Sequence, residues 1–327
     1  MRAVVITEGR ELEVRELAEP EPGEGQVRVR VAACGICGSD LHFLPSPAIP
    51  AGTVMGHEFA GEVDAVGPGV DDFSVGDRVC VYPFRPVDRH DLDVAMTTGL
   101  GMGGGQGAYA EKVVAAQEML WRLPEGMPLE QGALVEPLAV ALHGLDMAGV
   151  EPEDSCAVIG AGPIGIMTAV ALRARGVEQV VVVEKNERRA ERMRGLGFDT
   201  VGLDGVHEAV IEKLAGPPQV VLECAGHPTA PNLAIELVAP SGRVGLLGML
   251  EEPVQISQLL LMLKEAQLRA SFAYRPANFT EAMELIAAGR VPADELVTAR
   301  EPLERAPALF GELTAPDTDH VKVLLTP

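Results

Sequence analysis

Apolar and polar side chains alternate along the N-terminal third of the chain in the way that is typical of half-exposed β-strands. Glycine and proline residues separate the alternating runs and mark turns. Strands are predicted over residues 3–6, 12–14, 27–31, 58–66, 78–81 and 108–114. A helix is predicted next, from Leu129 through Glu136 and Pro137 to about Met147. The first part of the chain is therefore predicted to be a mainly antiparallel β-domain.

The pattern changes near Glu151. A short apolar strand at 156–159 leads into a glycine-containing turn at 160–165, which is followed by a helix over 166–175 and a second strand over 179–183. This order of elements is that of a βαβ unit, in which the two strands lie parallel. The second part of the chain is therefore predicted to belong to a different fold class from the first.

Later apolar runs at 220–222 and 244–247 alternate with helical segments such as 229–238, which indicates a doubly wound parallel sheet. After these come an amphipathic helix at 279–288 and a last strand-like segment at 320–325. These two could pair back onto the first domain and make it discontinuous. The predicted domains are residues 1–147 with 275–327, and residues 148–274.

Composition supports a globular protein and narrows its partners. The 327 residues are 47% hydrophobic, which is enough for a large core. The 26 Lys and Arg against 48 Asp and Glu give a net charge of −22 without any basic run, which disfavours nucleic acid as a partner. The N-terminus becomes charged too early for a signal peptide, and the longest apolar run, 156–172, contains turn glycines. We therefore expect a cytoplasmic protein without a membrane span.

Five cysteines, an odd and sparse set, do not suggest a disulfide framework. Cys34 and Cys37 form a Cys-x-x-Cys pair, which could be half of a four-cysteine zinc site or a redox pair. No second such pair exists, and the βαβ setting of a thioredoxin is absent. Cys34 ends a strand and is most simply a core residue. Cys37 precedes a polar loop and, with His57 and Glu58 of a second loop, offers ligands that suit zinc.

The turn Gly160-Ala161-Gly162-Pro163-Ile164-Gly165 follows a strand and opens a helix, as in dinucleotide-binding folds. Small residues let the backbone approach a pyrophosphate, whose charge the helix N-terminus stabilises. Glu184, at the end of the next strand, can accept hydrogen bonds from the adenosine ribose. The alternative is a structural tight turn. Glu184 favours NAD because it would repel the 2′-phosphate of NADP, although Arg188 and Arg189 could accommodate that phosphate.

At this point the sequence resembles the zinc-dependent medium-chain alcohol dehydrogenases, and most closely their polyol (sorbitol) and threonine dehydrogenase branch. Five motifs in the order of the family carry the resemblance over nearly the whole chain. They are Gly35-Ile-Cys37-Gly-Ser39-Asp40-Leu-His42, Gly56-His57-Glu58-Phe-Ala-Gly61-Glu62-Val63, Gly76-Asp-Arg-Val79, Glu136-Pro-Leu-Ala-Val140 and the turn at 160–165.

The resemblance implies a GroES-like catalytic domain, a Rossmann domain and a zinc ion in the cleft between them. Cys37 and His57 match the first two zinc ligands, and Glu136 matches a carboxylate at the position where other members have a second cysteine. Glu58 matches a residue that can approach the metal or hold the groups around it. Asp40 matches the acid that orients the ligating imidazole.

The resemblance also implies a mechanism in which zinc lowers the pKa of an alcohol and hydride passes to the nicotinamide. Ser39 and His42 match the proton relay from the alcohol towards solvent. For His42, the alternative is an ordinary surface histidine. Cys224 and Leu247 fall in segments that resemble those beside the nicotinamide, and for Cys224 an ordinary strand end is an equal alternative.

One departure from the family concerns metal content. Many members carry a lobe with four closely spaced cysteines that binds a structural zinc, whereas this chain has no cysteine between Val81 and Tyr109. We therefore expect one catalytic zinc and no structural zinc. The shortened segment, 82–107, also weakens any transfer of substrate specificity from the family.

Taken together, these features predict a zinc-dependent dehydrogenase that uses NAD, with NADP possible, and a small secondary alcohol or polyol as substrate. A homo-oligomer, dimer or tetramer, is expected. One alternative is a zinc-free NADPH-dependent quinone or enone reductase of the same fold. Another is a dinucleotide-binding sensor without catalytic activity.

Overall fold

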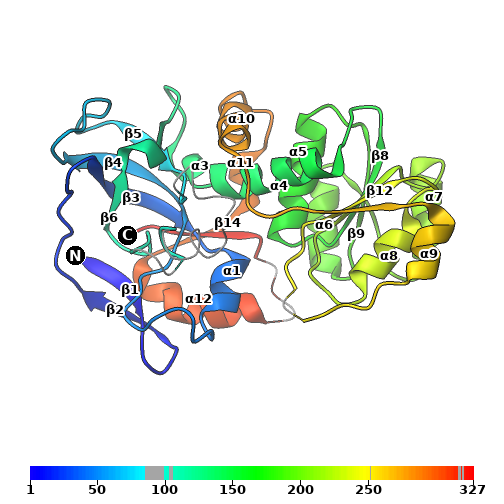
Figure 1. Ribbon diagram of the computed structural model, residues 1–327, viewed down its shortest axis with the longest axis horizontal. Helices are drawn as coiled ribbons and strands as arrows, with labels where there is room; N and C mark the ends of the chain where they lie inside the picture. The colour runs from blue at the N-terminus through cyan, green and yellow to red at the C-terminus, as the bar shows by residue number, and fades with distance from the viewer. Residues whose placement is uncertain (85–98, 103–105, 251, 316–317, 319) are drawn as a thin grey trace. The chain divides into compact units, whose positions relative to one another are not determined.

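The chain divides into two compact units, each described here by itself. Unit 1 consists of Met1–Glu136 and Ile286–Pro327, and unit 2 of Pro137–Leu285. Both chain termini lie in unit 1 (Figure 1). The computed structural model describes residues 1–84, 99–102, 106–250, 252–315, 318 and 320–327.

The sequence predicted a ligand-facing loop and no membrane span. Most of the segment at 87–107, predicted to be a ligand-facing loop, lies outside the described residues. Within the described ranges, no helix combines the length and the hydropathy needed to cross a bilayer.

Unit 1 is built mainly from β-strands. The elements of its first segment are β1 (Arg2–Ile6), β2 (Leu12–Glu16), β3 (Gln26–Gly35), α1 (Gly38–Phe43), β4 (Glu58–Val66), β5 (Arg78–Val81), β6 (Lys112–Ala116), the 3-10 helix η1 (Gln117–Met119), β7 (Leu120–Arg122) and α3 (Leu129–Gly132). Those of its second segment are α11 (Ala293–Leu296), β14 (Val297–Glu301), the 3-10 helix η2 (Leu303–Arg305), α12 (Ala306–Thr314) and β15 (Lys322–Leu325).

A seven-stranded sheet organises unit 1, and β3 is its central strand. The order is β14-β15-β3-β4-β5-β7, with β6 also paired to β3, while β1 and β2 form a separate hairpin. The pairs are antiparallel except β14 with β15. The last strand returns to the first domain as predicted, with Leu324 opposite Gly35 (Figure 1). The buried faces of these strands share one core that includes Val29, Phe59 and Val323.

The helix predicted from Leu129 to Met147 is two helices, α3 and α4 (Val135–Ala148). Pro137 explains the break, because in one continuous helix its missing N–H and its ring would conflict with the carbonyl four residues earlier. With a new helix beginning at Val135, Pro137 falls in the first turn, where no N–H donor is needed. The single-helix prediction was therefore wrong at this point.

Unit 2 alternates strands and helices. Its elements are α4, β8 (Ser155–Ile159), α5 (Pro163–Ala174), β9 (Gln179–Val183), α6 (Glu187–Gly195), β10 (Asp199–Val201), α7 (Val206–Leu214), β11 (Val220–Glu223), α8 (Ala230–Leu237), β12 (Arg243–Leu246), α9 (Gln258–Lys264), β13 (Gln267–Ala270) and α10 (Pro276–Ala287).

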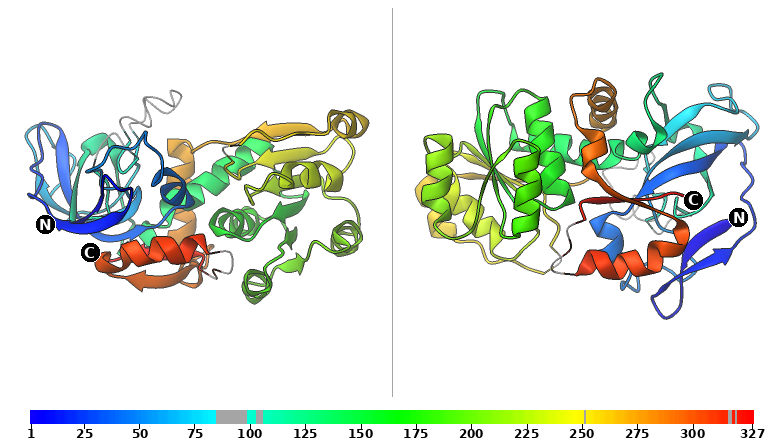
Figure 2. Two further views of the ribbon diagram at one scale, coloured as in Figure 1. Left: turned by 90° about the horizontal axis from the view of Figure 1, so that it is seen from below. Right: turned by 180° about the vertical axis from the view of Figure 1, so that it is seen from behind.

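The six strands of unit 2 form a parallel sheet in the order β10-β9-β8-β11-β12-β13. Helices lie on both sides of it, which confirms the doubly wound fold (Figure 2). Ala157, Val181 and Val221 face one core with α7 and α8. Val158 and Val182 point to the other face and are also buried. Such continuous burial is typical of parallel strands that helices cover on both sides.

Unit 2 includes most of α4 and α10, whereas the sequence-based boundaries at 147 and 275 assign both helices to the first domain. Polar contacts tie these helices to α5. Arg175 donates to Asp146 at 2.6 Å and to Glu281 at 2.9 and 2.7 Å, and Asn278 donates to Asp146 at 2.6 Å. Two of these pairs, Arg175 with Glu281 and Asn278 with Asp146, join residues more than a hundred positions apart, so local pattern does not predict them.

Gly165 shows why the turn before α5 requires glycine. A Cβ atom at this position would lie 1.9 Å from the carbonyl oxygen of Gly160, which is a backbone atom that a rotamer change cannot move. The turn and the helix therefore lie so close together that only glycine, which has no Cβ atom, fits at this position.

Replacing Gly165 by alanine is expected to lower the free energy of unfolding by about 2 kcal/mol or more, because overpacking forces the backbone to shift. Gly195→Ala is the matched control, since Gly195 also lies in a helix but has no atom near its missing Cβ. That change should leave stability unchanged or raise it slightly. Urea unfolding of both variants tests this, and equal midpoints would show that the close approach is absent.

Candidate metal centre and dinucleotide-binding turn

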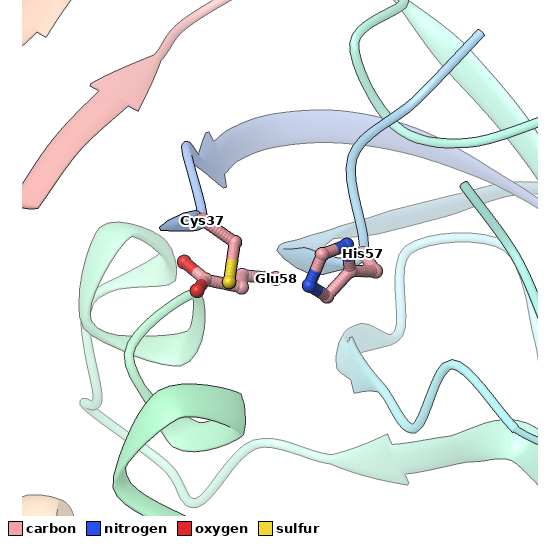
Figure 3. Close-up of side chains that lie close together, drawn as sticks. All are labelled: Cys37, His57 and Glu58. Carbon is pink, nitrogen blue, oxygen red and sulfur yellow. The ribbon is translucent and has the colours of Figure 1, made fainter. Parts of the chain in front are cut away.

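Three potential metal ligands meet where β3 ends and β4 begins. The antiparallel register places Gly35 opposite Glu58, so the residues just after β3 lie beside those just before β4. Cys37, His57 and Glu58 are thereby brought together, and their ligand atoms lie within 4.8 Å of one another. Figure 3 shows the three side chains lying close together. The sheet register, not the local loop sequence, creates the cluster.

The chemistry of this cluster fits zinc. A thiol, an imidazole and a carboxylate are the three kinds of side chain that bind Zn²⁺ in proteins. His57 and Glu58 are buried, and within the described part of the chain the buried Nδ1 of His57 makes no hydrogen bond. A cation held by the donor atoms of this cluster would offset part of the cost of removing them from water.

Asp40 is fixed beside the cluster by two hydrogen bonds. Its Oδ2 accepts from the backbone N–H of Cys37 at 3.0 Å, as part of a capping box at the start of α1, and from the hydroxyl of Tyr109 at 2.5 Å. Its Oδ1 lies 3.5 Å from Nδ1 of His57. Burial alone would lower the pKa of His57, but the charges of Asp40 and Cys37 outweigh burial and raise it. Asp40 therefore stands where the sequence predicted an acid that orients the imidazole.

A buried ion pair lies on the other side of the cluster. The Nζ atom of Lys322, in β15, donates to both carboxylate oxygens of Glu58, at 2.8 and 2.6 Å, and to the carbonyl of Ile36 at 3.1 Å. Both side chains of the pair are only 1% exposed. Gly35 leaves room for it, because a Cβ there would lie 2.1 Å from Oε2 of Glu58. Burial lowers the pKa of Lys322, but Glu58 and the neighbouring anions raise it by more, so the amine stays charged.

Sequence analysis missed Lys322 and Tyr109. The signal for Lys322 was present, since it is the single charged residue in an otherwise apolar strand, Val321 to Leu325. A lysine in such a place is buried only if it has a partner. Nothing local to Tyr109 distinguishes it from an ordinary core tyrosine.

Glu136 stands apart from the three clustered ligands. It is the second residue of α4 and is buried, and its charge contributes to the raised pKa of Lys322, which places it near this centre. Among the residues that the structure describes, however, it does not lie within 4.8 Å of all three ligand atoms. Three of the four predicted ligands are therefore grouped, and the role of Glu136 stays a prediction.

The predicted relay residues lie on α1. The hydroxyl of Ser39 is 3.5 Å from Nε2 of His57. His42 follows three residues later and is exposed to solvent. Residues three apart lie on the same face of a helix. Their arrangement is therefore compatible with a relay from the centre outwards, which stays a prediction.

The remaining cysteine of the pair belongs to the core. Cys34 is fully buried among apolar side chains. Burial, followed by the charges of Asp40 and Glu58, raises its pKa well above the ordinary value, so it remains a thiol. This agrees with its predicted packing role.

In unit 2, Glu184 holds the glycine turn in place. Its carboxylate accepts from the backbone N–H of Ala161 at 2.6 Å and from that of Asn186 at 2.7 Å. The guanidinium of Arg189, on α6, lies beside the same turn, with one nitrogen 3.9 Å from where a Cβ of Gly162 would be. Gly162 is the N-cap of α5, with Pro163, Ile164 and Gly165 in its first turn. The predicted cofactor residues therefore surround one helix N-terminus.

The other two predicted cofactor residues are packing residues in this structure. The thiol of Cys224 donates to Oγ1 of Thr168 at 3.5 Å, and burial raises its pKa to about 12. Leu247 packs against α4, with its Cδ2 atom 2.2 Å from where a Cβ of Gly144 would be. Contact of either residue with a cofactor stays a prediction.

Glu223, which the sequence analysis did not select, holds the turn after β11. Its carboxylate accepts from the N–H groups of Ala225 at 2.7 Å and Gly226 at 2.9 Å. Burial raises its pKa more than these hydrogen bonds lower it. The signal was an acid at the end of an apolar strand, the same pattern that identified Glu184.

Lys322→Met is expected to lower the free energy of unfolding of the metal-free protein by about 3–5 kcal/mol, because it leaves a buried carboxylate without its partner. The control is Lys213→Met, which breaks the exposed pair with Asp199 and should have little effect. Adding Glu58→Gln to Lys322→Met should restore part of the loss. Guanidinium unfolding measures all three, and equal effects of the two lysine changes would contradict the assignment.

Comparison with known proteins gives two family matches. Residues 23–125 match the alcohol dehydrogenase GroES-like domain, and residues 163–288 match the zinc-binding dehydrogenases. The (R,R)-butanediol dehydrogenase of Bacillus subtilis (strain 168) is 34% identical over 348 residues, covering 100% of both chains. A sorbitol dehydrogenase of Halalkalibacterium halodurans is 31% identical over 334 residues, covering 96% of this chain and 95% of the relative.

Solved structures agree with these matches. The crystal structure of 2R,3R-butanediol dehydrogenase from Bacillus subtilis has a TM-score of 0.92 at 33% identity, covering 100% of this chain and 99% of that one. A short chain alcohol dehydrogenase from E. coli CFT073 in complex with NADH has a TM-score of 0.89 at 27% identity, and a protein of Sinorhizobium meliloti 1021 bound to NADP has one of 0.88 at 29%, each with the same coverage. The chain therefore belongs to the zinc-dependent medium-chain alcohol dehydrogenases, in their polyol dehydrogenase branch.

Proposed function

We propose that the protein is a zinc-dependent oxidoreductase that transfers a hydride between a secondary alcohol or polyol and a nicotinamide cofactor. The observation that carries this proposal is the group of half-buried Cys37 and buried His57 and Glu58, whose donor atoms lie within 4.8 Å of one another. The names of the relatives, butanediol and sorbitol dehydrogenases, support the substrate class. A zinc-free reductase would have no use for this group.

Cys37, His57 and Glu136 are the proposed protein ligands of a single zinc ion, with Glu58 beside them. This choice between the two glutamates rests on Lys322, which engages both oxygens of Glu58. When bound, zinc lowers the pKa of an alcohol and stabilises negative charge on its oxygen. Asp40, held by Tyr109, keeps the His57 ring in one orientation.

The proposed proton path runs along α1. Oγ of Ser39 accepts the proton that leaves the alcohol and passes its own proton towards the imidazole of His42, which is exposed and releases it to solvent. An imidazole suits this step because its ordinary pKa lies near neutrality. The path gives the chain's own residues the general-base part of the reaction.

The turn at 160–165 is the proposed binding site of the cofactor pyrophosphate, at the N-terminus of α5. We propose NAD as the preferred cofactor, because Glu184 presents a carboxylate at the end of β9. Its bonds to Ala161 and Asn186 leave lone pairs for ribose hydroxyls. The guanidinium of Arg189 beside the turn keeps NADP possible, and solved relatives hold either cofactor.

A homo-oligomer is also proposed, and an apolar surface of unit 2 supports it. The exposed fractions of Leu259, Met262 and Leu263 on α9 are 68%, 65% and 73%, and that of Phe272, which follows β13, is 53%. Strand β13 ends the sheet beside them. Apolar side chains grouped in this way are typical of protein interfaces.

The deciding experiment is a screen of butanediols, polyols, amino alcohols and simple secondary alcohols with NAD⁺ and NADP⁺ in parallel, on zinc-loaded protein. We expect alcohol oxidation with NAD⁺ preferred, and a loss of about 100-fold or more in kcat/KM for Cys37→Ser, because a lost metal ligand removes the Lewis acid. Cys80→Ser, which changes a buried thiol of unit 1 away from the cluster, should keep activity.

Two outcomes would contradict the proposal. NADPH oxidation by quinones or enones, without alcohol oxidation and unaffected by Cys37→Ser, would favour the zinc-free reductase. Tight NADH binding without turnover over the whole panel would favour the sensor.

A further inference from the structure

The segment that follows α1 is short of donors for its own carbonyl groups. It contains Pro45, Pro47 and Pro50, and a proline has no backbone N–H. It also begins at the C-terminal end of α1, where the last carbonyls of a helix have no partner within the helix. Its own N–H groups reach the carbonyls of Phe43 at 2.9 Å and Ser46 at 3.3 Å. Further donors for this segment must therefore come from elsewhere.

One side chain from a distant hairpin supplies them. Arg10, in the turn between β1 and β2, donates from Nε to the carbonyl of Leu44 at 2.8 Å and from one terminal nitrogen to that of Ile49 at 2.6 Å. Its other terminal nitrogen donates to the carbonyls of Phe43, at 3.4 Å, and Ser46. All three guanidinium nitrogens thus bind one segment, which the rigid fork of arginine permits and a lysine cannot reproduce.

The backbone of Arg10 is in an unfavourable conformation. Its φ angle is 61°, in the left-handed region that residues with a Cβ rarely adopt. The hairpin that imposes this conformation is closed by the N–H of Thr7, which donates to the carbonyl of Glu11 at 2.8 Å. Glycine would fit this backbone better, so any advantage of arginine here lies in its side chain.

We propose that Arg10 is a positioning residue for the proton path: it fixes the C-terminal end of α1 and so holds Ser39 and His42 in line. The inference rests on the proposed function of these two residues. Its physical basis is that α1, with six residues, is too short to be stable by itself and depends on contacts at its ends. A guanidinium at the C-terminal carbonyls also has the favourable sign for the helix dipole.

Arg10→Gly and Arg10→Ala test this, with Arg15→Ala as control. Arg15 lies on the same hairpin but is exposed, and its guanidinium pairs with the neighbouring Glu13. The glycine variant removes the side chain while relieving the backbone, so it should fold. Amide hydrogen exchange over residues 38–49 is expected to be about tenfold faster in both Arg10 variants than in the control.

Turnover supplies a second readout that a merely structural role would not change. For zinc-loaded protein, kcat of alcohol oxidation should fall by about tenfold in the Arg10 variants, because misplacing a general base costs part of its 10²–10⁴-fold effect. A small external base such as imidazole buffer should restore it. The dissociation constant of NADH should stay unchanged, because the glycine turn lies in unit 2.

Unchanged exchange over 38–49 in the Arg10 variants would overturn the proposal. So would faster exchange with unchanged kcat, because α1 would then be held without any effect on the proton path. If wild-type protein oxidised no alcohol, the proposed function would fail instead, and the exchange experiment would still decide whether Arg10 holds α1.

Discussion

The metal centre depends on one buried ion pair. Glu58 is a carboxylate with 1% exposure, and in the absence of a cation it would be among the most costly groups in the molecule. Its partner Lys322 lies 264 residues later in the chain. The C-terminal strand, which pairs with β3, therefore brings the compensating charge to this centre.

Other buried carboxylates are also compensated, by hydrogen bonds that they accept. Asp40 is satisfied by Tyr109 and by the backbone of Cys37, which leaves its other oxygen beside His57. In unit 2, Glu184 and Glu223 each bind backbone N–H groups of the turn that follows a strand. In both units, buried carboxylates therefore fix the conformation of loops by accepting hydrogen bonds from backbone N–H groups.

Much of the fold could be predicted from local pattern. The bounds of β4, β5 and β9 agree with the predicted strands, because glycine, proline or charged residues stand close to the ends of these apolar runs. The prediction of one helix over 129–147 was wrong. Proline breaks the interior of a helix but is tolerated in its first turn, and the sequence pattern does not show that a new helix begins just before Pro137. Most of α4 and α10 belongs to unit 2, where Asp146 and Glu281 pair with Arg175, a contact that no periodicity encodes.

The site residues that lie in recognisable sequence motifs could be predicted, and those that lie outside such motifs could not. Cys37, His57 and Glu58 lie in two short motifs that the register of β3 and β4 brings together. Lys322, Tyr109 and Arg10 each act from a distant segment through the contacts of one side chain, and their neighbours in sequence say nothing about their partners. The choice between Glu58 and Glu136 as ligand is also a matter of geometry, since both are buried acids near the same lysine.

We propose that one zinc ion binds at Cys37 and His57 while Cys34 remains a core thiol. Zinc X-ray absorption spectroscopy on purified protein, combined with elemental analysis, tests this proposal. We expect one zinc per chain with one sulfur ligand, at about 2.3 Å, and nitrogen or oxygen ligands otherwise. Two sulfur ligands, no sulfur ligand, or two zinc ions per chain would contradict it.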